Sequence, residues 1–347
     1  MFKKIVLPGL FLCLSATGLF AQQGEEGNLV KWMKLDEAME KVKTQPRPIL
    51  MDFYTDWCGW CKQMMRTTYA NPDLAQYINS NFYPVKFNAE TKDTVEYLGE
   101  KYGPLGEGPR TTNALAAKLL QNKLMYPTTL FLNNFDKQKS EFVFSMLAQG
   151  YLETNKLEPM LIFTLENAFR NSNFEDFKVQ YDKAFFDTAT ERKTKQVKWM
   201  TPSEAFNKKE SSKKKTIVLI NTGWCNACRI MQRTTFIDSL PYDSIKKNFD
   251  VVDFNPEITD TIVFKGQTFI NPRTQQAPFH QLAVALCNKG LTLPTFVVLD
   301  EQMNVIDAVP YYITPGLIKK ITAYYTNDVY KKKTWNDFMA EINKGKP

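Results

Sequence analysis

Residues 49–62 read Ile-Leu-Met-Asp-Phe-Tyr-Thr-Asp-Trp-Cys-Gly-Trp-Cys-Lys, an apolar run that leads into a Trp-Cys-x-x-Cys motif. A run of this length predicts a buried strand, and residues 62–66 (Lys-Gln-Met-Met-Arg) favour a helix. Cys58 is therefore expected at a helix N-terminus, where free N–H groups and the helix dipole stabilise an anion. The thiolate is the form of cysteine that attacks disulfides, and Cys61, one turn later, is placed to resolve a mixed disulfide. The motif predicts a redox site.

The same motif occurs a second time in the chain. Residues 217–229 repeat it around Cys225 and Cys228, and the offset from Cys58 to Cys225 is the period of the repeat. Without a gap, this offset relates Trp32 to Trp199, Met33 to Met200, Met64 to Met231, Asn88 to Asn255 and Pro127-Thr128 to Pro294-Thr295. Because the period is as long as a whole domain, two copies of one domain explain the repeat better than a solenoid does.

Length and composition agree with two globular domains. A chain of 347 residues suggests about two domains, and contents of 44% hydrophobic and 13% aromatic residues are ample for two cores. The net charge of +7 is mild and spread along the chain, so it does not favour binding to nucleic acid. The lysine-rich run 208–215 is expected to be a solvated loop, and a site for an acidic partner is the alternative.

Residues 1–21 are expected to be a signal peptide. Two lysines, an apolar centre over residues 5–20 and Ala21 at the cleavage site form the pattern. A retained membrane anchor is the alternative, although the apolar run is short and a Pro-Gly pair interrupts it. We therefore expect a periplasmic or secreted protein of the bacterial envelope, without stable membrane insertion after cleavage.

The expected organisation is a signal peptide over residues 1–21, a first domain over 22–186, a linker over 187–196 and a second domain over 197–347. The linker is polar and charged, as is typical of a segment between domains. Within the first copy, the pattern predicts helices over residues 32–42, 62–66, 71–78, 112–120 and 156–168, and strands over 49–54, 82–87, 126–132 and 142–146.

The cysteines are arranged for catalysis rather than for a structural framework. Of six cysteines, removal of residues 1–21 leaves two closely spaced pairs and Cys287. A zinc site built from these pairs is the alternative. Cys287 lies on an apolar segment predicted to be helical and is expected to be a buried, inert thiol. His280, the single histidine, is expected to be structural or to cap a helix, so a histidine-dependent triad is not available.

Each half of the chain resembles a thioredoxin-fold domain, and the whole is similar to secreted bacterial proteins with tandem thioredoxin-like modules. The resemblance is carried by the two Trp-Cys-x-x-Cys motifs and by Tyr126-Pro127-Thr128 and Leu293-Pro294-Thr295. It implies an α/β fold in which each domain has a central mixed β-sheet flanked by helices. It also implies cis bonds at Pro127 and Pro294, with the backbones of Tyr126 and Leu293 free to pair with an extended substrate. The implied substrate-binding residues are Trp57, Tyr126, Pro127, Trp224, Leu293 and Pro294.

The two copies differ at one position that matters for the chemistry. Thioredoxins carry a buried acid where this sequence has Asp52, and Lys86 matches the lysine that neighbours that acid. The resemblance therefore gives Asp52 a role in proton transfer. The second copy has Leu219 and Asp253 at these positions, so we expect slower resolution by Cys228 unless Asp253 supplies the missing carboxylate.

The predicted function is thiol–disulfide exchange, with Cys58, Cys61, Cys225 and Cys228 as the catalytic residues. Without a nearby histidine to stabilise the thiolate, reduction or exchange is favoured over oxidation. The expected partners are disulfide-containing envelope proteins and an unidentified thiol electron donor; no cofactor beyond the redox-active disulfides and no metal are expected. A thioredoxin-fold adaptor or chaperone without essential redox turnover is the alternative. The segment between the second cysteine and the proline is equally long in both copies, and it is expected to add a helix and a loop near the active-site rim.

Overall fold

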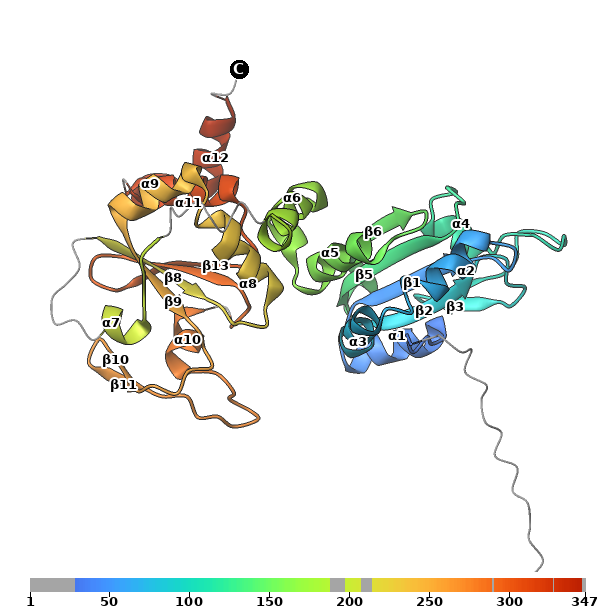
Figure 1. Ribbon diagram of the computed structural model, residues 1–347, viewed down its shortest axis with the longest axis horizontal. Coiled ribbons are helices and arrows are strands. Elements are labelled where there is room, and N and C mark those ends of the chain that lie inside the picture. Colours follow the sequence, from blue (N-terminus) through green and yellow to red (C-terminus); the bar gives the residue numbers. More distant parts are fainter. Residues whose placement is uncertain (1–28, 188–196, 207–213, 289, 327, 345–347) are drawn as a thin grey trace, which may run out of the picture.

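The computed structural model describes residues 29–187, 197–206, 214–288, 290–326 and 328–344. The first half of the chain is built on a four-stranded mixed sheet in the order β2-β1-β5-β6 (Figure 1). Its strands are β1 (Ile49–Tyr54), β2 (Tyr83–Asn88), β5 (Thr128–Asp136) and β6 (Glu141–Gln149). β1 runs parallel to β2 and antiparallel to β5, and β6 is antiparallel to β5.

The second half of the chain is built on a five-stranded sheet in the order β13-β12-β8-β9-β7. Its strands are β7 (Trp199–Met200), β8 (Lys215–Ile220), β9 (Phe249–Phe254), β12 (Thr295–Leu299) and β13 (Val305–Pro310). The pairing register repeats with the sequence. Ile49 pairs with Tyr83 and Leu132, and Thr216, at the same place in the second copy, pairs with Asp250 and Leu299.

The expected fold class is thereby confirmed, since two mixed sheets are each flanked by helices. The predicted signal peptide, residues 1–21, and residues 188–196 of the predicted linker lie outside the described residues. No helix in the described ranges is long and apolar enough to cross a membrane.

The helices of the first half are α1 (Leu35–Thr44), α2 (Gly59–Arg66), α3 (Pro72–Asn81), α4 (Ala114–Leu119) and α5 (Thr154–Leu165). α1 starts later than the predicted helix over residues 32–42. The residues before it are extended, because Met33 forms a parallel bridge to Val85 and its N–H donates to the Pro84 carbonyl over 2.9 Å. Between β2 and α4 lies a hairpin that was not predicted, β3 (Val95–Tyr97) and β4 (Glu100–Tyr102).

The helices of the second half are α7 (Pro202–Phe206), α8 (Asn226–Ile230), α9 (Ser239–Asn248), α10 (Gln281–Leu286), α11 (Pro315–Thr326) and α12 (Trp335–Lys344), with a hairpin of β10 (Ile262–Phe264) and β11 (Gln267–Phe269). α8 continues directly as the π-helical turn η3 (Met231–Thr235). Of residues 208–215, which were predicted to form a solvated loop, residues 208–213 lie outside the described residues. The prediction is wrong for Lys215, the first residue of β8. Its buried ammonium group lies 2.8 Å from carboxylate oxygens of both Glu301 and Asp328.

The helix α6 (Phe174–Phe185), which the sequence pattern did not predict, lies with α5 between the two sheets (Figure 1). α6 belongs to the core of the second half. Phe177 and Tyr181 are buried, and the Phe177 ring packs edge-on against the Tyr312 ring with 5.2 Å between centroids. The side-chain amide of Asn171 also donates to the Pro310 carbonyl over 2.8 Å. The expected boundary at residue 186 stays a prediction, and this packing argues for counting α6 with the second core.

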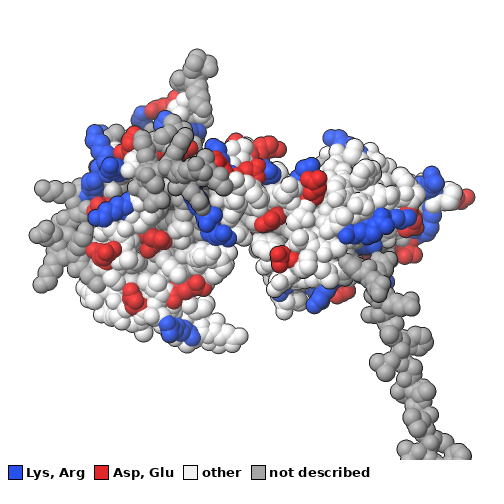
Figure 2. Space-filling view, viewed as in Figure 1, with Lys and Arg blue, Asp and Glu red and all other residues white. Residues whose placement is uncertain are grey.

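Charged side chains do not gather into a field of one sign on the visible face. Figure 2 shows acidic and basic side chains interspersed over both halves, with uncharged areas between them. This distribution agrees with the even spread of charge along the sequence.

Candidate active site

The first cysteine pair lies where β1 passes into α2. Cys58 is the N-cap of α2, and its sulfur accepts a hydrogen bond from the Cys61 N–H over 3.1 Å. The two cysteines form a disulfide with an S–S distance of 2.09 Å. The expected position of Cys58 at the helix start is confirmed. An attacking cysteine is expected to be more exposed than its resolving partner, but Cys58 and Cys61 are both only 4% exposed. The position at the helix start, rather than access to solvent, distinguishes the two sulfur atoms of the disulfide.

Aromatic side chains form the rim of the first site. Trp57 is 53% exposed, and its indole N–H donates to both carboxylate oxygens of Glu90, at 3.0 and 3.1 Å. The guanidinium of Arg110, from the segment between Cys61 and Pro127, lies 5.6 Å from the Trp57 ring centroid. The Tyr126 ring packs edge-on against Trp57 at 6.3 Å. The predicted contribution of the extra segment to the rim is therefore confirmed in the first half.

The peptide bonds before Pro127 and Pro294 are both cis, as the resemblance implied. The register explains why these bonds lie near the cysteine motifs. Thr128 pairs with Phe53 near the end of β1, and Thr295 pairs with Ile220 at the end of β8, so each proline lies at the edge from which a motif emerges. The roles of Tyr126 and Leu293 in substrate binding stay predictions.

Asp52 is a buried carboxyl in the strand that leads to Cys58. It is 1% exposed, and its Oδ1 accepts a hydrogen bond from the Tyr69 hydroxyl over 3.2 Å. Burial raises the pKa of Asp52 to about 7, against the opposing effects of the Tyr69 hydrogen bond and the Lys86 charge. Lys86 is the register partner of Asp52 on β2. The first half therefore holds a carboxyl group that changes its charge near neutral pH.

The second cysteine pair repeats the geometry of the first. Cys225 is the N-cap of α8 and forms a disulfide with Cys228, with an S–S distance of 2.03 Å. Both are more deeply buried than their counterparts, at 2% and 0% exposed. Trp224 is 62% exposed, and its indole N–H donates to Glu257 over 3.0 Å, the bond that Trp57 makes with Glu90. The four predicted catalytic cysteines thus pair within their own motifs.

Asp253, the candidate replacement for Asp52, is held by two side-chain amides. Its Oδ1 accepts from Asn221 over 2.5 Å and its Oδ2 accepts from Gln232 over 3.4 Å. Leu219 is fully buried in β8 and carries no titratable group. That Asp253 replaces the acid missing at Leu219 stays a prediction. The two amides already satisfy part of the hydrogen-bonding capacity of the Asp253 carboxylate.

The second site includes a carboxylate that sequence reasoning missed. Glu166, the C-cap of α5 in the first half, accepts hydrogen bonds from the N–H groups of Asn226 over 3.0 Å and Ala227 over 2.6 Å. Its Oε2 also lies 3.6 Å from the Cys225 sulfur. Desolvation of the carboxylate raises the pKa of Glu166 to about 7, although both N–H bonds and the charge of Arg229 oppose the shift. Glu166 lies far before Cys225 in the chain and outside both repeat motifs, so no local pattern marks it.

The remaining two sequence candidates are structural. Cys287, the unpaired cysteine of the described residues, is 3% exposed, and burial raises the pKa of its thiol to about 11. His280 is the N-cap of α10, and its Nδ1 accepts from the Leu282 N–H over 3.2 Å. The predictions of a buried thiol and a capping histidine are confirmed.

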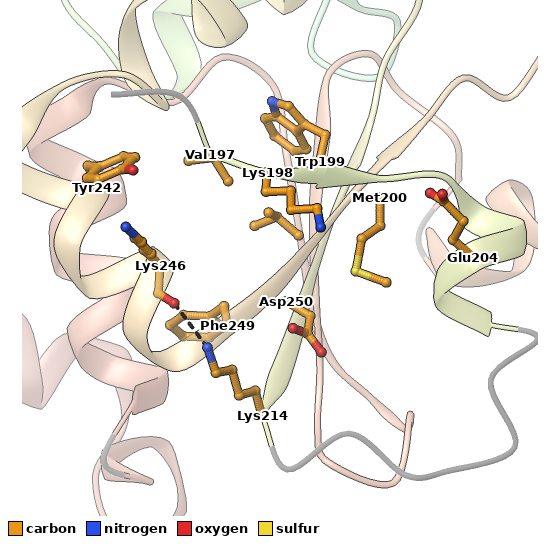
Figure 3. A pocket seen from close by; sticks show the side chains of 11 residues that line it. Val197, Lys198, Trp199, Met200, Glu204, Lys214, Tyr242, Lys246, Phe249 and Asp250 are labelled. Carbon is orange, nitrogen blue, oxygen red and sulfur yellow. Dashed lines mark hydrogen bonds between the residues drawn. The ribbon is translucent and has the colours of Figure 1, made fainter. Parts of the chain in front are cut away.

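A pocket of about 720 Å³ lies away from both cysteine pairs. It is formed by β7, β9 and α9, with Trp199, Tyr242 and Lys246 among its lining residues, and the Lys214 ammonium donates to the Lys246 carbonyl there (Figure 3). None of the predicted site residues lines this pocket. In the part of the chain that the structure describes, no group of three or more His, Cys, Asp or Glu side chains is arranged to hold a metal ion.

Comparison with known proteins gives matches to part of the chain. The family described as "Thioredox_DsbH: Protein of unknown function, DUF255" matches residues 15–105, which include the first cysteine motif. A thiol:disulfide interchange protein DsbD of Neisseria meningitidis serogroup A is 31% identical over 100 residues, covering 28% of this chain and 16% of that protein. The DsbD protein of Klebsiella pneumoniae is 40% identical over 43 residues, covering 12% of this chain and 7% of that protein. The chain thus spans less than a fifth of the length of these relatives.

Among solved structures, a thioredoxin-fold protein from Helicobacter pylori is similar at 14% identity and a TM-score of 0.30. The similarity covers 47% of this chain and 93% of that protein. At this TM-score, the likeness adds nothing to the sheet topology described above.

Proposed function

We propose that this protein is a thiol–disulfide oxidoreductase with two redox-active cysteine pairs. One observation carries the proposal: each pair forms a disulfide whose first cysteine caps the helix that follows a central strand, and a cis proline precedes the strand paired with that central strand. A cysteine at a helix N-terminus is stabilised as a thiolate, the nucleophile of disulfide exchange. The partial matches to proteins named for thiol:disulfide interchange support the same activity.

The reaction uses the two thiols of a reduced pair in order. The Cys58 thiolate attacks one sulfur of a substrate disulfide, and the other substrate sulfur leaves as a thiolate and takes up a proton. The Cys61 thiol then loses its proton and attacks the Cys58 sulfur, which forms the Cys58–Cys61 disulfide and releases the first substrate sulfur. Two electrons pass to the substrate, and a thiol donor must return two electrons to the pair.

Asp52 is the candidate proton acceptor for the resolving step. Its pKa of about 7, which burial causes, lets it exchange a proton at neutral pH. An extended segment of the substrate would pair with the backbone that precedes each cis proline, at Tyr126 before Pro127 and at Leu293 before Pro294. It would also contact the exposed rings of Trp57 and Trp224.

We assign reduction or exchange, rather than oxidation, as the direction of the reaction. The single histidine of the chain caps α10 and is not part of either cysteine motif, so it does not stabilise a thiolate there. We place the protein in the periplasm or at the surface of a bacterial envelope because of the charged and apolar pattern of residues 1–21. Its substrates would be disulfide-containing envelope proteins.

Reduction of insulin with dithiothreitol as the electron donor tests the activity. The native protein should accelerate precipitation of the insulin B chain, and the double variant Cys58→Ser/Cys225→Ser should lose the acceleration. Cys287→Ser is the matched control, because this buried thiol lies outside both motifs and its loss should leave the rate unchanged. An unchanged rate in the double variant would favour an adaptor or chaperone without redox turnover.

Trapping of substrates tests the order of the two thiols. Cys61→Ser should accumulate mixed disulfides with substrate proteins, because Cys58 can still attack but nothing resolves the product. Cys58→Ser should not accumulate them. Equal trapping by both variants would contradict the assignment of Cys58 as the nucleophile.

A further inference from the structure

The second site differs from the first by a carboxylate that comes from the other half of the chain. Glu166 ends α5, and its side chain reaches the start of α8, where it holds the N–H groups of Asn226 and Ala227. The matching N–H groups of the first site belong to Gly59 and Trp60. Among the described residues, this arrangement occurs at the second site and not at the first.

Glu166 contacts the sulfur of Cys225, which is the atom that attacks the substrate. Glu166 Oε2 lies 3.6 Å from the Cys225 sulfur. In the oxidised protein, this sulfur belongs to a disulfide and has no proton to donate. When the pair is reduced, the same position brings a carboxylate within hydrogen-bonding distance of the thiol proton of Cys225.

We propose that Glu166 is the proton-exchanging carboxylate of the second redox site. It accepts the proton of Cys225 when that thiol becomes the attacking thiolate, and while it is ionised it opposes formation of the thiolate. The inference rests on the proposed function, because it concerns the chemistry of one of the two cysteine pairs.

Glu166 opposes formation of the Cys225 thiolate because the two anions compete for the N-terminus of α8. The N–H groups and partial positive charge at the start of α8 stabilise one anion, and the Glu166 carboxylate already occupies two of these donors. Two negative charges this close repel each other, so one proton is shared between Glu166 and Cys225. The pKa of Glu166, raised to about 7 by burial, matches this exchange at neutral pH.

Two arginines lie in the region between Glu166 and α6, since Arg229 acts on Glu166 and the Arg233 guanidinium lies 5.7 Å from the Phe185 ring. Arg229, on α8, acts on Glu166 and lies 4.9 Å from the Phe185 ring of α6. The other titratable groups that face this region are Tyr77 from α3, Tyr181 from α6 and Glu158 from α5. The charge of Arg229 lowers the pKa of Glu166 but does not outweigh desolvation, so the coupling between Glu166 and a Cys225 thiolate remains.

The exchange balances in protons and electrons. Cys225 transfers its proton to Glu166 and attacks a substrate disulfide. The bond between Cys225 and one substrate sulfur forms as the substrate S–S bond breaks. The leaving substrate sulfur takes a proton from water. Cys228 then loses its proton to water and attacks the Cys225 sulfur. The released substrate sulfur takes the proton from Glu166, which returns to the carboxylate form. The substrate gains two electrons and two protons.

The pH dependence of Cys225 alkylation tests the inference. The full-length chain carrying Cys228→Ser is reduced and treated with iodoacetamide between pH 5.5 and 9, and modification of each cysteine is followed by mass spectrometry. Adding Glu166→Gln should accelerate alkylation of Cys225 at pH 7 by about tenfold or more, because a like charge is removed beside the thiol. Alkylation of Cys58 in the same sample should not change, which reports that the fold is intact.

Two further variants separate proton exchange from a merely structural role. Glu166→Asp keeps the charge and should keep the pH profile closer to the native one than Glu166→Gln does. Glu153→Gln makes the same chemical change at the opposite end of α5, where the side chain is exposed, and should leave the profile of Cys225 unchanged.

An unchanged profile in Glu166→Gln would overturn the proposal. Equal acceleration by Gln and Asp at every pH would also overturn it, since that result reports only increased access to the sulfur. Alkylation requires no turnover, so an inactive protein in the insulin assay would count against the proposed function without affecting this result.

Discussion

At the scale of single residues, we propose that one carboxyl group with a raised pKa exchanges protons at each redox site. Asp52 lies within the first half, on the strand that leads to Cys58, and Glu166 reaches the second site from the preceding helix. Burial raises the pKa of each group to about 7. Ionisation of either group therefore costs folding free energy at neutral pH, which is expected of a residue kept for chemistry.

Asp52→Asn should stabilise the protein at alkaline pH and slow the first site. The folded state holds the Asp52 proton up to about pH 7, while the unfolded chain releases it near 3.8, so stability is lost as pH rises through this window. Asparagine does not titrate, so it removes this loss of stability, and its side-chain oxygen can still accept the hydrogen bond from Tyr69. We expect a gain in unfolding free energy of at most about 4 kcal/mol at pH 8 and none at pH 4.

Urea denaturation at both pH values measures this gain, and Asp93→Asn, an exposed loop position, is the matched control. The rate of the first site is measured as insulin reduction by a chain that retains only the Cys58–Cys61 pair. A variant that gains no stability at pH 8 would show that Asp52 is ionised in the folded protein at little cost. An unchanged rate would remove Asp52 from the proton-transfer step.

At the scale of elements, the short helix α10 depends on a histidine for its N-terminus. The Nδ1 of His280 accepts from Leu282, and its Nε2 lies 3.1 Å from the Asp260 carbonyl oxygen. Burial lowers the pKa of His280, because the charged form would lose its hydration. The protonated ring would also lose the acceptor that caps α10.

His280→Asn should weaken the acid sensitivity of the fold. Because the folded pKa of His280 is depressed, stability that is present above the unfolded value of about 6.5 is lost as pH falls through it. Asparagine caps helices well and does not titrate. The difference in urea midpoint between native protein and variant should therefore change between pH 7.5 and 5.5, in favour of the variant at the lower pH. A constant difference would mean that the histidine protonates in the folded state without penalty.

At the scale of the whole molecule, the two halves are joined by packing as well as by the chain. Phe177 of α6 is buried against Tyr312 of the second half, and the Arg233 guanidinium donates to the Ala184 carbonyl over 3.1 Å. Through the C-terminus of α5, the first half also brings Glu166 to Cys225. The second site is therefore completed by residues that precede its own repeat.

Phe177→Ala should destabilise the second half selectively. Loss of a buried phenylalanine leaves a cavity and costs about 3–5 kcal/mol. Hydrogen exchange should show reduced protection of β8 and β12, with the protection of β1 and β5 retained. Phe186→Ala is the matched control, because this ring is 60% exposed and its removal should have little effect. Equal loss of protection in β1 would place α6 in a core common to both halves.

The chemistry-bearing motifs and the fold class follow from the amino-acid sequence. The apolar strands and the helices after them predicted Cys58 and Cys225 at helix starts, and the constant offset predicted two copies of one domain. The structure shows that these copies share their strand register. These features follow from local preferences, such as helix capping and the burial of apolar strands, which act over a few residues. The cis prolines followed from the family resemblance rather than from such preferences.

Only the tertiary structure decided which residues of one half serve the other. Glu166 reaches Cys225 from the end of α5, and α6 packs onto the second core although it precedes the predicted linker. Such contacts depend on how two folded surfaces meet, and no local propensity or motif spacing encodes that. The low exposure of Cys58 and Cys225 likewise arises from tertiary packing around the disulfides. The difference between the two redox sites is therefore a property of the assembled chain.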